Sequence, residues 1–438
     1  MKDWFGRLGL LLLGGLGGLS FLMLVEAGLN RFAPRRETYP TGFYRRDEHV
    51  GWIGVPNLTR RHRFGAIKLH VDRNSHGFRD RERTYRKNPG VFRIVVLGDS
   101  FTEGIQVRLD KVFPSVLERQ LNAEGNIRYE VLNLGITSFG TDQEYLALQH
   151  YGLRYDPDLV VLAFFTGNDI RENSYAINIG AVVPPNCSPG KPYFVLKNGD
   201  LVLRPLCPVS SALEPSSPAS AETTGTGLAR RRLRESMAKF FPNIYYTAKD
   251  AVASTPWLED LFRKAGLKTS SQEAAGGTEA QDKIMTRVLL NQQVYAVDQA
   301  PEWRDAWQVT RQLVRRMSED LRQRNIRFLV VIIPNEFEFR PLRLAGLPGF
   351  DTFKFDLLQP ERMLCSFLER EGIPQLVLRP EFEKYTFETG KDLYLRDDGH
   401  WNAAGHALVA DLLRERMRDS RLLRWPDKPA SNPSTCSN

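Results

Sequence analysis

The chain has 438 residues, of which 42% are hydrophobic and 26% are charged, so its composition is that of a globular protein and not of a disordered or fibrous one. This length allows one large domain with insertions, or two domains. A net charge of +8 would suit a nucleic-acid partner, but no nucleic-acid-binding motif accompanies it. We therefore expect no nucleic acid and a basic solvated surface that favours anionic lipid or glycan.

The N-terminus carries an apolar run from Leu8 to Val25, with Lys2 and Arg7 ahead of it. As a helix this run would rise about 27 Å, roughly one hydrocarbon thickness. No convincing A-x-A cleavage site follows, so residues 1–30 are predicted to form an uncleaved transmembrane signal anchor. A buried core helix is the alternative. Arginines just beyond the run weaken the charge asymmetry that would set its orientation.

Residues 31–90 are predicted to form small strands and loops that lead into the core, and we call them the lead-in. From Phe92, buried strands alternate with amphipathic helices, which indicates a parallel α/β sheet over residues 91–175 and 291–420. The tail, 421–438, is expected to be disordered. Strands are predicted at 92–97, 129–134, 158–165, 327–333 and 375–378, and helices at 113–122, 302–324, 360–371 and 402–418.

A long insertion, residues 176–290, separates the two parts of the α/β pattern. It begins with two apolar segments around Asn198-Gly199, a strong signal for a two-residue hairpin turn. A stretch rich in Ser, Pro, Ala and Thr follows and is expected to be disordered. A basic amphipathic helix near Leu233 comes next. It either docks on its own domain, covers an active site as a lid, or lies on a membrane.

The four cysteines give evidence on whether the catalytic domain lies inside or outside the cytoplasm. Cys187 and Cys207 flank the predicted hairpin, whose paired strands would bring them close enough for a disulfide, although two unrelated thiols remain an alternative. Cys365 lies among apolar residues and is interpreted as a buried thiol, whereas Cys436 lies in the polar tail. A disulfide would place the catalytic domain outside the cytoplasm, which is what we expect.

A serine directly follows the first predicted strand of the sheet, in the tripeptide Gly98-Asp99-Ser100. The carboxyl ends of parallel strands are where α/β sheets place their ligands, so the Ser100 hydroxyl could act there as a nucleophile near backbone N–H groups. Alone the tripeptide is a weak signal, because Gly-Asp is also ordinary turn chemistry. It is not the G-x-S-x-G nucleophile elbow, which disfavours a standard α/β-hydrolase.

The next two strands end in residues suited to an oxyanion hole. Gly135 follows the second strand, and its N–H could approach a substrate closely because glycine has no side chain. Asn168 follows the third strand, and its amide is a neutral donor that needs no deprotonation. A turn glycine and a helix-capping asparagine are the alternative interpretations of these two residues.

A base for the serine is predicted at His400, on a loop that leads into the last helix. Asp397 and Asp398 precede this histidine by three and two residues, so either carboxylate could fix its tautomer. His406 lies inside the helix that follows, and its apolar neighbours favour a packing role.

Four blocks now stand in chain order, GDSFTEG, NLGITSFG, TGND and DDGHWN, and at this point the chain resembles the SGNH/GDSL hydrolase superfamily. The resemblance covers roughly residues 92–170 and 300–418. It implies a flavodoxin-like three-layer α/β/α fold with a parallel sheet in the order 2-1-3-4-5. It also implies esterase or acyl-transfer chemistry without a metal or a cofactor.

Site roles follow from the resemblance. Ser100 would attack an acyl carbonyl and His400 would take its proton. The backbone N–H groups of Ser100 and Gly135, with the Asn168 side chain, would stabilise the oxyanion.

The orienting carboxylate stays open at this stage. The Asp-x-x-His spacing selects Asp397. The Asp-x-His-Trp form, seen in relatives that acetylate bacterial exopolysaccharides such as alginate, selects Asp398. Because Trp401 follows the histidine here, Asp398 is slightly favoured.

Residues 74–80 (NSHGFRD) and the long insertion resemble those of bacterial GDSL proteins that are encoded with polysaccharide systems and are often anchored in the membrane. We therefore expect a single-pass protein of the bacterial inner membrane, held there by its N-terminal helix, with a periplasmic catalytic domain. It would hydrolyse or transfer O-acetyl groups on an extracytoplasmic polysaccharide. Its expected partners are an acylated glycan or small ester substrate and polysaccharide biosynthesis proteins. The alternatives are a membrane-associated lipase or thioesterase, and an inactive SGNH domain that binds glycan in envelope assembly.

Overall fold

The structure is a computed structural model that describes residues 21, 23–25, 42–64, 67–125, 127–179, 187–188, 190–207, 293–339, 355–395, 398–420 and 422–423. The chain divides into two compact units, of which one is Met1–Thr38 with Val209–Val288 and the other is Tyr39–Pro208 with Leu289–Asn438. Nearly all of the described residues belong to the second unit, which carries the α/β sheet.

Several sequence predictions fall outside the described residues. These are the basic helix near Leu233, the Ser/Pro-rich stretch, the C-terminal tail and most of the apolar run Leu8–Val25. Within the part of the chain that the structure describes, no helix combines the length and apolar character needed to cross a bilayer.

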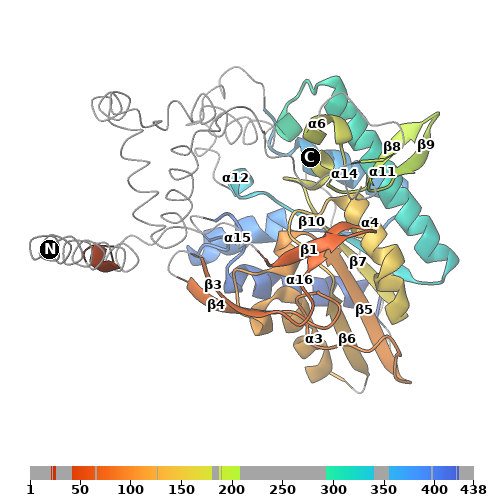
Figure 1. The fold of residues 1–438 in the computed structure, drawn as a ribbon. Coiled ribbons are helices and arrows are strands. Elements are labelled where there is room, and N and C mark those ends of the chain that lie inside the picture. The colour runs from red at the N-terminus through yellow and green to blue at the C-terminus, as the bar shows by residue number, and fades with distance from the viewer. Residues whose placement is uncertain are drawn as a thin grey trace, which may run out of the picture. The chain divides into compact units, whose positions relative to one another are not determined.

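A five-stranded parallel sheet forms the centre of the second unit (Figure 1). Its spatial order is β11-β10-β7-β5-β6, which in chain order is 2-1-3-4-5, so the expected strand order is confirmed. Each strand falls within one residue of its predicted position, because an uninterrupted run of apolar residues is required where both faces of a sheet are covered. The strands are β5 (Val91–Gly98), β6 (Arg128–Asn133), β7 (Leu159–Phe165), β10 (Arg327–Ile333) and β11 (Gln375–Val377).

Helices cover both faces of this sheet and bury alternate strand residues in two separate cores. Val95 and Leu97 of β5 face one core, and Ile94 and Val96 face the other, as the period of two in a strand requires. The first core contains residues of α4 (Thr141–His150), α11 (Pro301–Gln323) and α14 (Gln359–Arg370). The second contains residues of α3 (Phe113–Ala123), α15 (Arg379–Thr389) and α16 (Ala403–Asp419).

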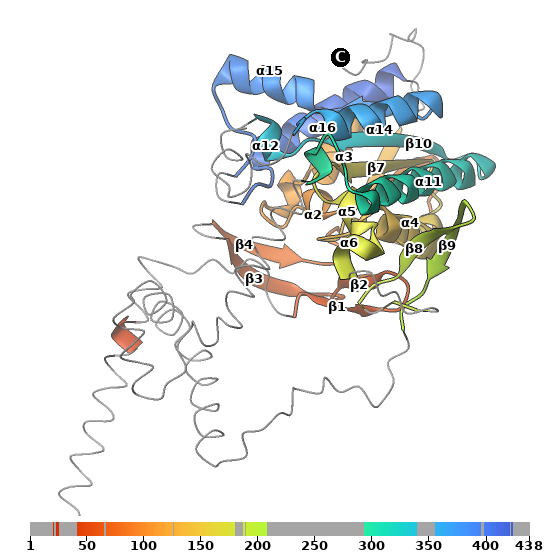
Figure 2. The same ribbon diagram turned by 90° about the horizontal axis from the view of Figure 1, so that it is seen from above.

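The residues that lead into the sheet form two small antiparallel pairs, as expected for this region. Figure 2 shows these pairs as the four strands β1 to β4, which precede the sheet in the chain. Their bounds are β1 (Tyr44–Asp47), β2 (Gly51–Gly54), β3 (Thr59–Phe64) and β4 (Ile67–Asp72). The short helices are α2 (Ser100–Glu103), η1 (Leu109–Lys111), η2 (Gly152–Tyr155), α5 (Asp169–Glu172), α6 (Tyr175–Ile179), η3 (Gln293–Tyr295) and α12 (Glu336–Phe339).

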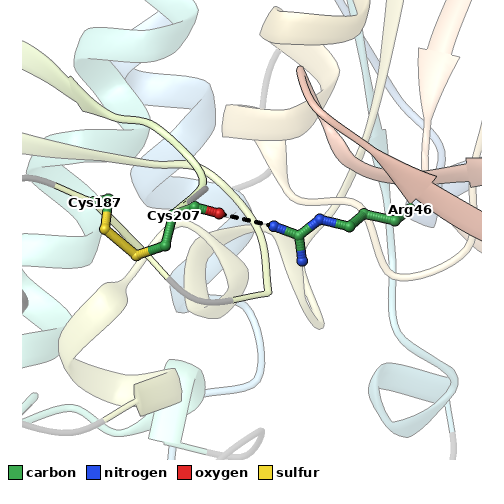
Figure 3. The surroundings of a disulfide bond; sticks show 3 residues. All are labelled: Arg46, Cys187 and Cys207. Carbon is green, nitrogen blue, oxygen red and sulfur yellow. Dashed lines mark hydrogen bonds between the residues drawn. A yellow bond between two sulfur atoms is a disulfide. The ribbon is translucent and has the colours of Figure 1, made fainter. Parts of the chain in front are cut away.

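The predicted hairpin of the insertion is present as β8 (Tyr193–Lys197) and β9 (Asp200–Arg204). Asn198 and Gly199 both have positive φ, at 55° and 90°, as a tight two-residue turn of this kind requires. Cys187 and Cys207 form the predicted disulfide at the base of this hairpin. Figure 3 shows Arg46 of β1 donating a hydrogen bond of 3.0 Å to the Cys207 carbonyl oxygen, which ties the disulfide to the lead-in strands.

Cys365 corrects one sequence prediction. It is fully buried in the first core, as its apolar neighbours indicate, but it is disulfide-bonded and is not a free thiol. The prediction was wrong because burial and apolar neighbours describe a half-cystine as well as they describe a thiol, and pairing is a long-range property.

Candidate active site

Ser100 lies at the carboxyl end of strand β5, which lies between β7 and β6 in the sheet, where the chain turns sharply into α2. The turn is tight, because a Cβ atom on Gly98 would lie 2.2 Å from the Thr102 Oγ1 atom. Asp99 caps the short helix, since its Oδ1 atom accepts a hydrogen bond of 2.9 Å from the Phe101 N–H. Ser100 is 7% exposed and therefore largely shielded from solvent.

His400 reaches this serine from a loop 300 residues later in the chain. The loop is held by backbone hydrogen bonds from the Leu395 N–H to the His400 carbonyl oxygen and from the Asn402 N–H to the Leu393 carbonyl oxygen. The adjacent Trp401 is fully buried. The Asn402 side chain then caps α16 by accepting from Ala404 and Gly405, so the histidine lies directly before a rigid helix.

A continuous chain of hydrogen bonds joins three predicted site residues. The His400 Nε2 atom lies 2.7 Å from the Ser100 Oγ atom, and the His400 Nδ1 atom lies 2.5 Å from the Asp398 Oδ1 atom. A serine, a base and an orienting carboxylate in this order are what nucleophilic acyl chemistry requires. Asp397 lies outside the described residues, so the structure places Asp398 in contact with the histidine and says nothing of its neighbour.

The ionisation of Asp398 fits an orienting role. Burial would raise its pKa, but the hydrogen bond and the charge of His400 outweigh burial, and the net result is a lowered pKa. The carboxylate is therefore charged at neutral pH, as it must be to stabilise an imidazolium. The nearby Gln106 side chain also lowers the pKa of Asp398. No sequence signal singled out Gln106, because a lone glutamine in a loop matches no motif.

Asn168 lies beside the nucleophile. It is the N-cap residue of α5, and its side chain is close enough to the carboxyl group of Asp99, the residue directly before Ser100, to lower the pKa of that group. An asparagine amide carries two N–H donors, which suit it to stabilise a developing oxyanion.

Gly135 is placed differently from what the sequence suggested. Its N–H already donates a hydrogen bond of 2.9 Å to the Asn133 Oδ1 atom, so this arrangement does not leave it free for an oxyanion. A Cβ atom here would lie 2.5 Å from the Thr102 Cβ atom and 2.6 Å from the Glu103 nitrogen. The glycine is thus explained by close packing against α2, because any side chain would displace the nucleophile helix.

Motif reasoning did not single out three buried carboxyl groups near the site. They are those of Asp99, Glu144 of α4 and Asp169 of α5. Each is completely buried, and each has at least one carboxyl oxygen without a hydrogen-bond partner among the described residues. Burial raises the pKa of Asp99 to about 6, while the hydrogen bond from Phe101, the charge of His400 and the Asn168 side chain oppose the rise. Burial and the neighbouring acids also raise the pKa values of Glu144 and Asp169 well above their ordinary range.

These acids escaped sequence reasoning because isolated Asp and Glu residues normally indicate a solvated surface. In the part of the chain that the structure describes, no three His, Cys, Asp or Glu side chains are placed to hold a metal ion.

Comparison with known proteins identifies part of the chain. The sequence model of a family described as SGNH hydrolase-like domain, acetyltransferase AlgX, matches residues 292–432. The matched range includes Asp398 and His400 and lies entirely after Ser100. No curated protein matches the chain.

Solved structures resemble the chain at low identity. The acetyl xylan esterase AlAXEase is 13% identical over 74% of this chain and 98% of its own, with a TM-score of 0.34. A two-domain esterase (CEX) active on acetylated mannans is 13% identical over 79% of this chain and 53% of its own, with a TM-score of 0.34. The lipase/acylhydrolase from Enterococcus faecalis is 13% identical over 75% and 95%, again with a TM-score of 0.34.

Residues 292–432 thus match an SGNH hydrolase-like family. The strand order of the sheet and the hydrogen-bonded chain of Ser100, His400 and Asp398 agree with the resemblance of the four sequence blocks to the SGNH/GDSL hydrolase superfamily, whose enzymes cleave ester bonds or transfer acyl groups.

Proposed function

We propose that this protein is a serine esterase or acyltransferase that works through a covalent acyl-enzyme. The observation that carries the proposal is the hydrogen-bonded chain from the Ser100 Oγ atom through the His400 imidazole to the Asp398 carboxylate, with both distances at or below 2.7 Å. A degenerate domain that only bound glycan would be under no requirement to keep this geometry, so the intact chain favours the enzyme.

The mechanism follows from the positions of these groups. The Ser100 Oγ atom attacks the acyl carbonyl carbon while its proton passes to the His400 Nε2 atom, and the charged Asp398 stabilises the imidazolium. The Ser100 N–H and the Asn168 amide stabilise the tetrahedral oxyanion. Collapse of the intermediate expels an alcohol, which takes the proton from His400. Water or a sugar hydroxyl, deprotonated by His400, then attacks the acyl group, and His400 returns the proton to the Ser100 Oγ atom as that oxygen leaves.

We propose an O-acetyl group on a polysaccharide as the substrate. One support is the matched family, which is described as that of an acetyltransferase. The other is the contact of Asp398 with His400, because Asp398 is the carboxylate that the Asp-x-His-Trp form selects. The proposed place of action is the periplasmic face of the inner membrane. A disulfide between Cys187 and Cys207 supports an oxidising compartment, and the apolar run Leu8–Val25 supports a membrane anchor.

Fluorophosphonate labelling of the full-length chain in detergent, followed by peptide mass spectrometry, tests the mechanism. We expect label on the peptide that contains Ser100, and we expect Ser100→Ala and His400→Ala to lose it. A folded wild-type protein that takes no label, or takes it elsewhere, would contradict the proposed nucleophile.

Release of acetate from an acetylated polysaccharide, measured against release of fatty acid from a long-chain ester, tests the substrate class. Transfer to a deacetylated glycan would show as new acetyl signals by NMR. A preference for the long-chain ester would favour the lipase or thioesterase alternative.

Protease treatment of spheroplasts tests the location. A periplasmic catalytic domain is digested without lysis, whereas a cytoplasmic one survives until the membrane is opened.

A further inference from the structure

Glu103 ends the nucleophile helix α2, three residues after Ser100, and its side chain is fully buried. Its Oε2 atom accepts three hydrogen bonds, from the Tyr44 hydroxyl at 2.8 Å, the Thr137 N–H at 2.7 Å and the Thr137 hydroxyl at 2.6 Å. Tyr44 belongs to β1 of the lead-in, and Thr137 lies in the loop after β6 that also contains Gly135. One carboxylate oxygen therefore joins three segments that are distant in the chain.

The other carboxylate oxygen is paired with an arginine from the same lead-in. The Arg73 Nη2 atom lies 2.5 Å from the Glu103 Oε1 atom, and both side chains are completely buried. The Arg73 guanidinium also lies over the Tyr44 ring, 4.7 Å from its centre, and donates to the Gly77 carbonyl oxygen. A buried carboxylate without such a partner would be strongly unfavourable, and Arg73 supplies that partner.

A second lead-in arginine holds the backbone at the end of the same helix. Arg79 is fully buried and donates through Nη1 to the carbonyl oxygens of Glu103 and Gly104, at 3.0 and 2.6 Å. Its Nη2 atom donates to the Val107 carbonyl oxygen at 2.5 Å. The Glu103 carbonyl belongs to the last residue of α2 and the Gly104 carbonyl to its C-cap residue, where a helix leaves such groups without internal partners. The lead-in thus fixes both the last side chain and the last carbonyls of the nucleophile helix.

We propose that Glu103 is a positioning residue that holds Ser100 in place relative to the groups that stabilise the oxyanion, and that residues 42–80 of the lead-in are a structural part of the active centre. The proposal rests on the proposed acyl-enzyme function. Glu103 acts only through α2 and the Thr137 loop. Stability alone is a poor explanation for this ion pair, because well-packed apolar residues commonly replace a buried pair without loss of stability. What an apolar cluster could not supply is directional hydrogen bonding that fixes the helix against the loop.

The test compares Glu103→Gln with the matched control Glu130→Gln. Glu130 of β6 accepts a hydrogen bond of 2.7 Å from the buried Arg93, which lies on β5 seven residues before Ser100, about 20 Å away by strand rise. Both variants replace the carboxylate partner of a buried arginine, but only one lies at the site. With 4-nitrophenyl acetate as the probe, we expect Glu103→Gln to lower kcat by about 10- to 100-fold with little change in KM, because small displacements of a nucleophile cost that much.

A second variant, Tyr44→Phe, and the NMR signal of His400 separate a positioning role of Glu103 from a role in stability alone. If Glu103→Gln does not fold, Tyr44→Phe removes only one hydroxyl donor to the Glu103 Oε2 atom, and we expect a smaller loss of kcat in the same direction. The low-field NMR signal and the titration midpoint of His400 should move in these variants and stay unchanged in Glu130→Gln, since a shifted Ser100 alters the hydrogen bond at Nε2.

The outcomes separate the two proposals. Wild-type protein with neither turnover nor fluorophosphonate label would contradict the acyl-enzyme function, while the His400 signal would still decide the positioning role. Equal losses of kcat and melting temperature in the Glu103 and Glu130 variants, with an unmoved His400 signal, would overturn the positioning role and leave Glu103 a stability residue.

Discussion

The Trp401 ring packs edge-on against the Phe101 ring, with their centroids 4.8 Å apart. These are the residues directly after the base His400 and the nucleophile Ser100, and both are at most 2% exposed. The Phe101 ring also lies 4.9 Å from the imidazole ring of His400. The contact between serine and histidine is therefore supported by a buried aromatic pair, and polar hydrogen bonds are not its only restraint.

Replacing this aromatic support should harm both stability and catalysis. We expect Trp401→Ala to lower the free energy of unfolding by about 3–5 kcal/mol, because it leaves a large cavity in the second core. The rate of fluorophosphonate labelling at Ser100 should fall in protein that is still folded. Denaturant unfolding and labelling kinetics measure the two effects. A variant with the expected loss of stability but a normal labelling rate would show that the pair supports the core and not the site.

The adjacent acids Asp397 and Asp398 should behave differently. We expect Asp398→Asn to reduce kcat by about 10⁴, because the amide would favour the wrong tautomer of His400. Asp397→Asn serves as the neighbouring control and should have a mild effect. Steady-state kinetics on a small acetyl ester decide between them. The larger loss at Asp397, or mild losses at both, would remove Asp398 from the orienting role.

Asn168 should act in the transition state. We expect Asn168→Ala to lower kcat by about 10²–10³ with a small change in KM, because one oxyanion donor is lost. Asn168→Asp is a useful companion, since it keeps the size of the side chain but adds negative charge where negative charge develops. Wild-type turnover in the alanine variant would show that the oxyanion is held by other groups.

The buried Asp99 should make stability fall as pH rises through a defined window. Its pKa is raised to about 6 in the folded protein from an unfolded value of 3.8, so between these values the folded state binds more protons than the unfolded state. The free energy of unfolding therefore falls by about 3 kcal/mol on account of this group as pH rises from well below 3.8 to well above 6, and most steeply between these two values.

Asp99→Asn can still cap α2 and removes the titration, so its stability relative to wild type should improve across that window. Denaturant unfolding at pH 4.5 and 7 measures the difference. A stability difference between variant and wild type that does not change with pH would contradict the raised pKa.

Periodicity and turn chemistry determined much of the fold in advance. Apolar runs located all five strands of the sheet, because strands covered on both faces need uninterrupted apolar residues. The Asn198-Gly199 turn located the hairpin, because a tight two-residue turn needs positive φ at both positions. The resemblance to the SGNH/GDSL superfamily supplied the strand order, which a pattern of single strands does not contain.

The short motifs likewise singled out Ser100 at the carboxyl end of its strand, where α/β sheets place their ligands, and His400 on the loop before the last helix. Only the tertiary structure decided which groups meet there. The placement of Asp398 against the histidine depends on the path of one loop, and spacing alone allowed either of two adjacent acids. The occupied N–H of Gly135 and the disulfide of Cys365 depend on contacts that motifs and hydropathy do not encode.

The pairing of Arg73 with Glu103 was beyond any reading of the sequence, because charged residues usually mark solvent-facing positions. What the sequence by itself determined are the properties set by near neighbours: the periods of strands and helices, the turn and the chemical identity of the four blocks. What the tertiary structure decided are the pairings between distant segments, because a buried charge or a hydrogen-bond donor acquires its role only when folding brings its partner to it.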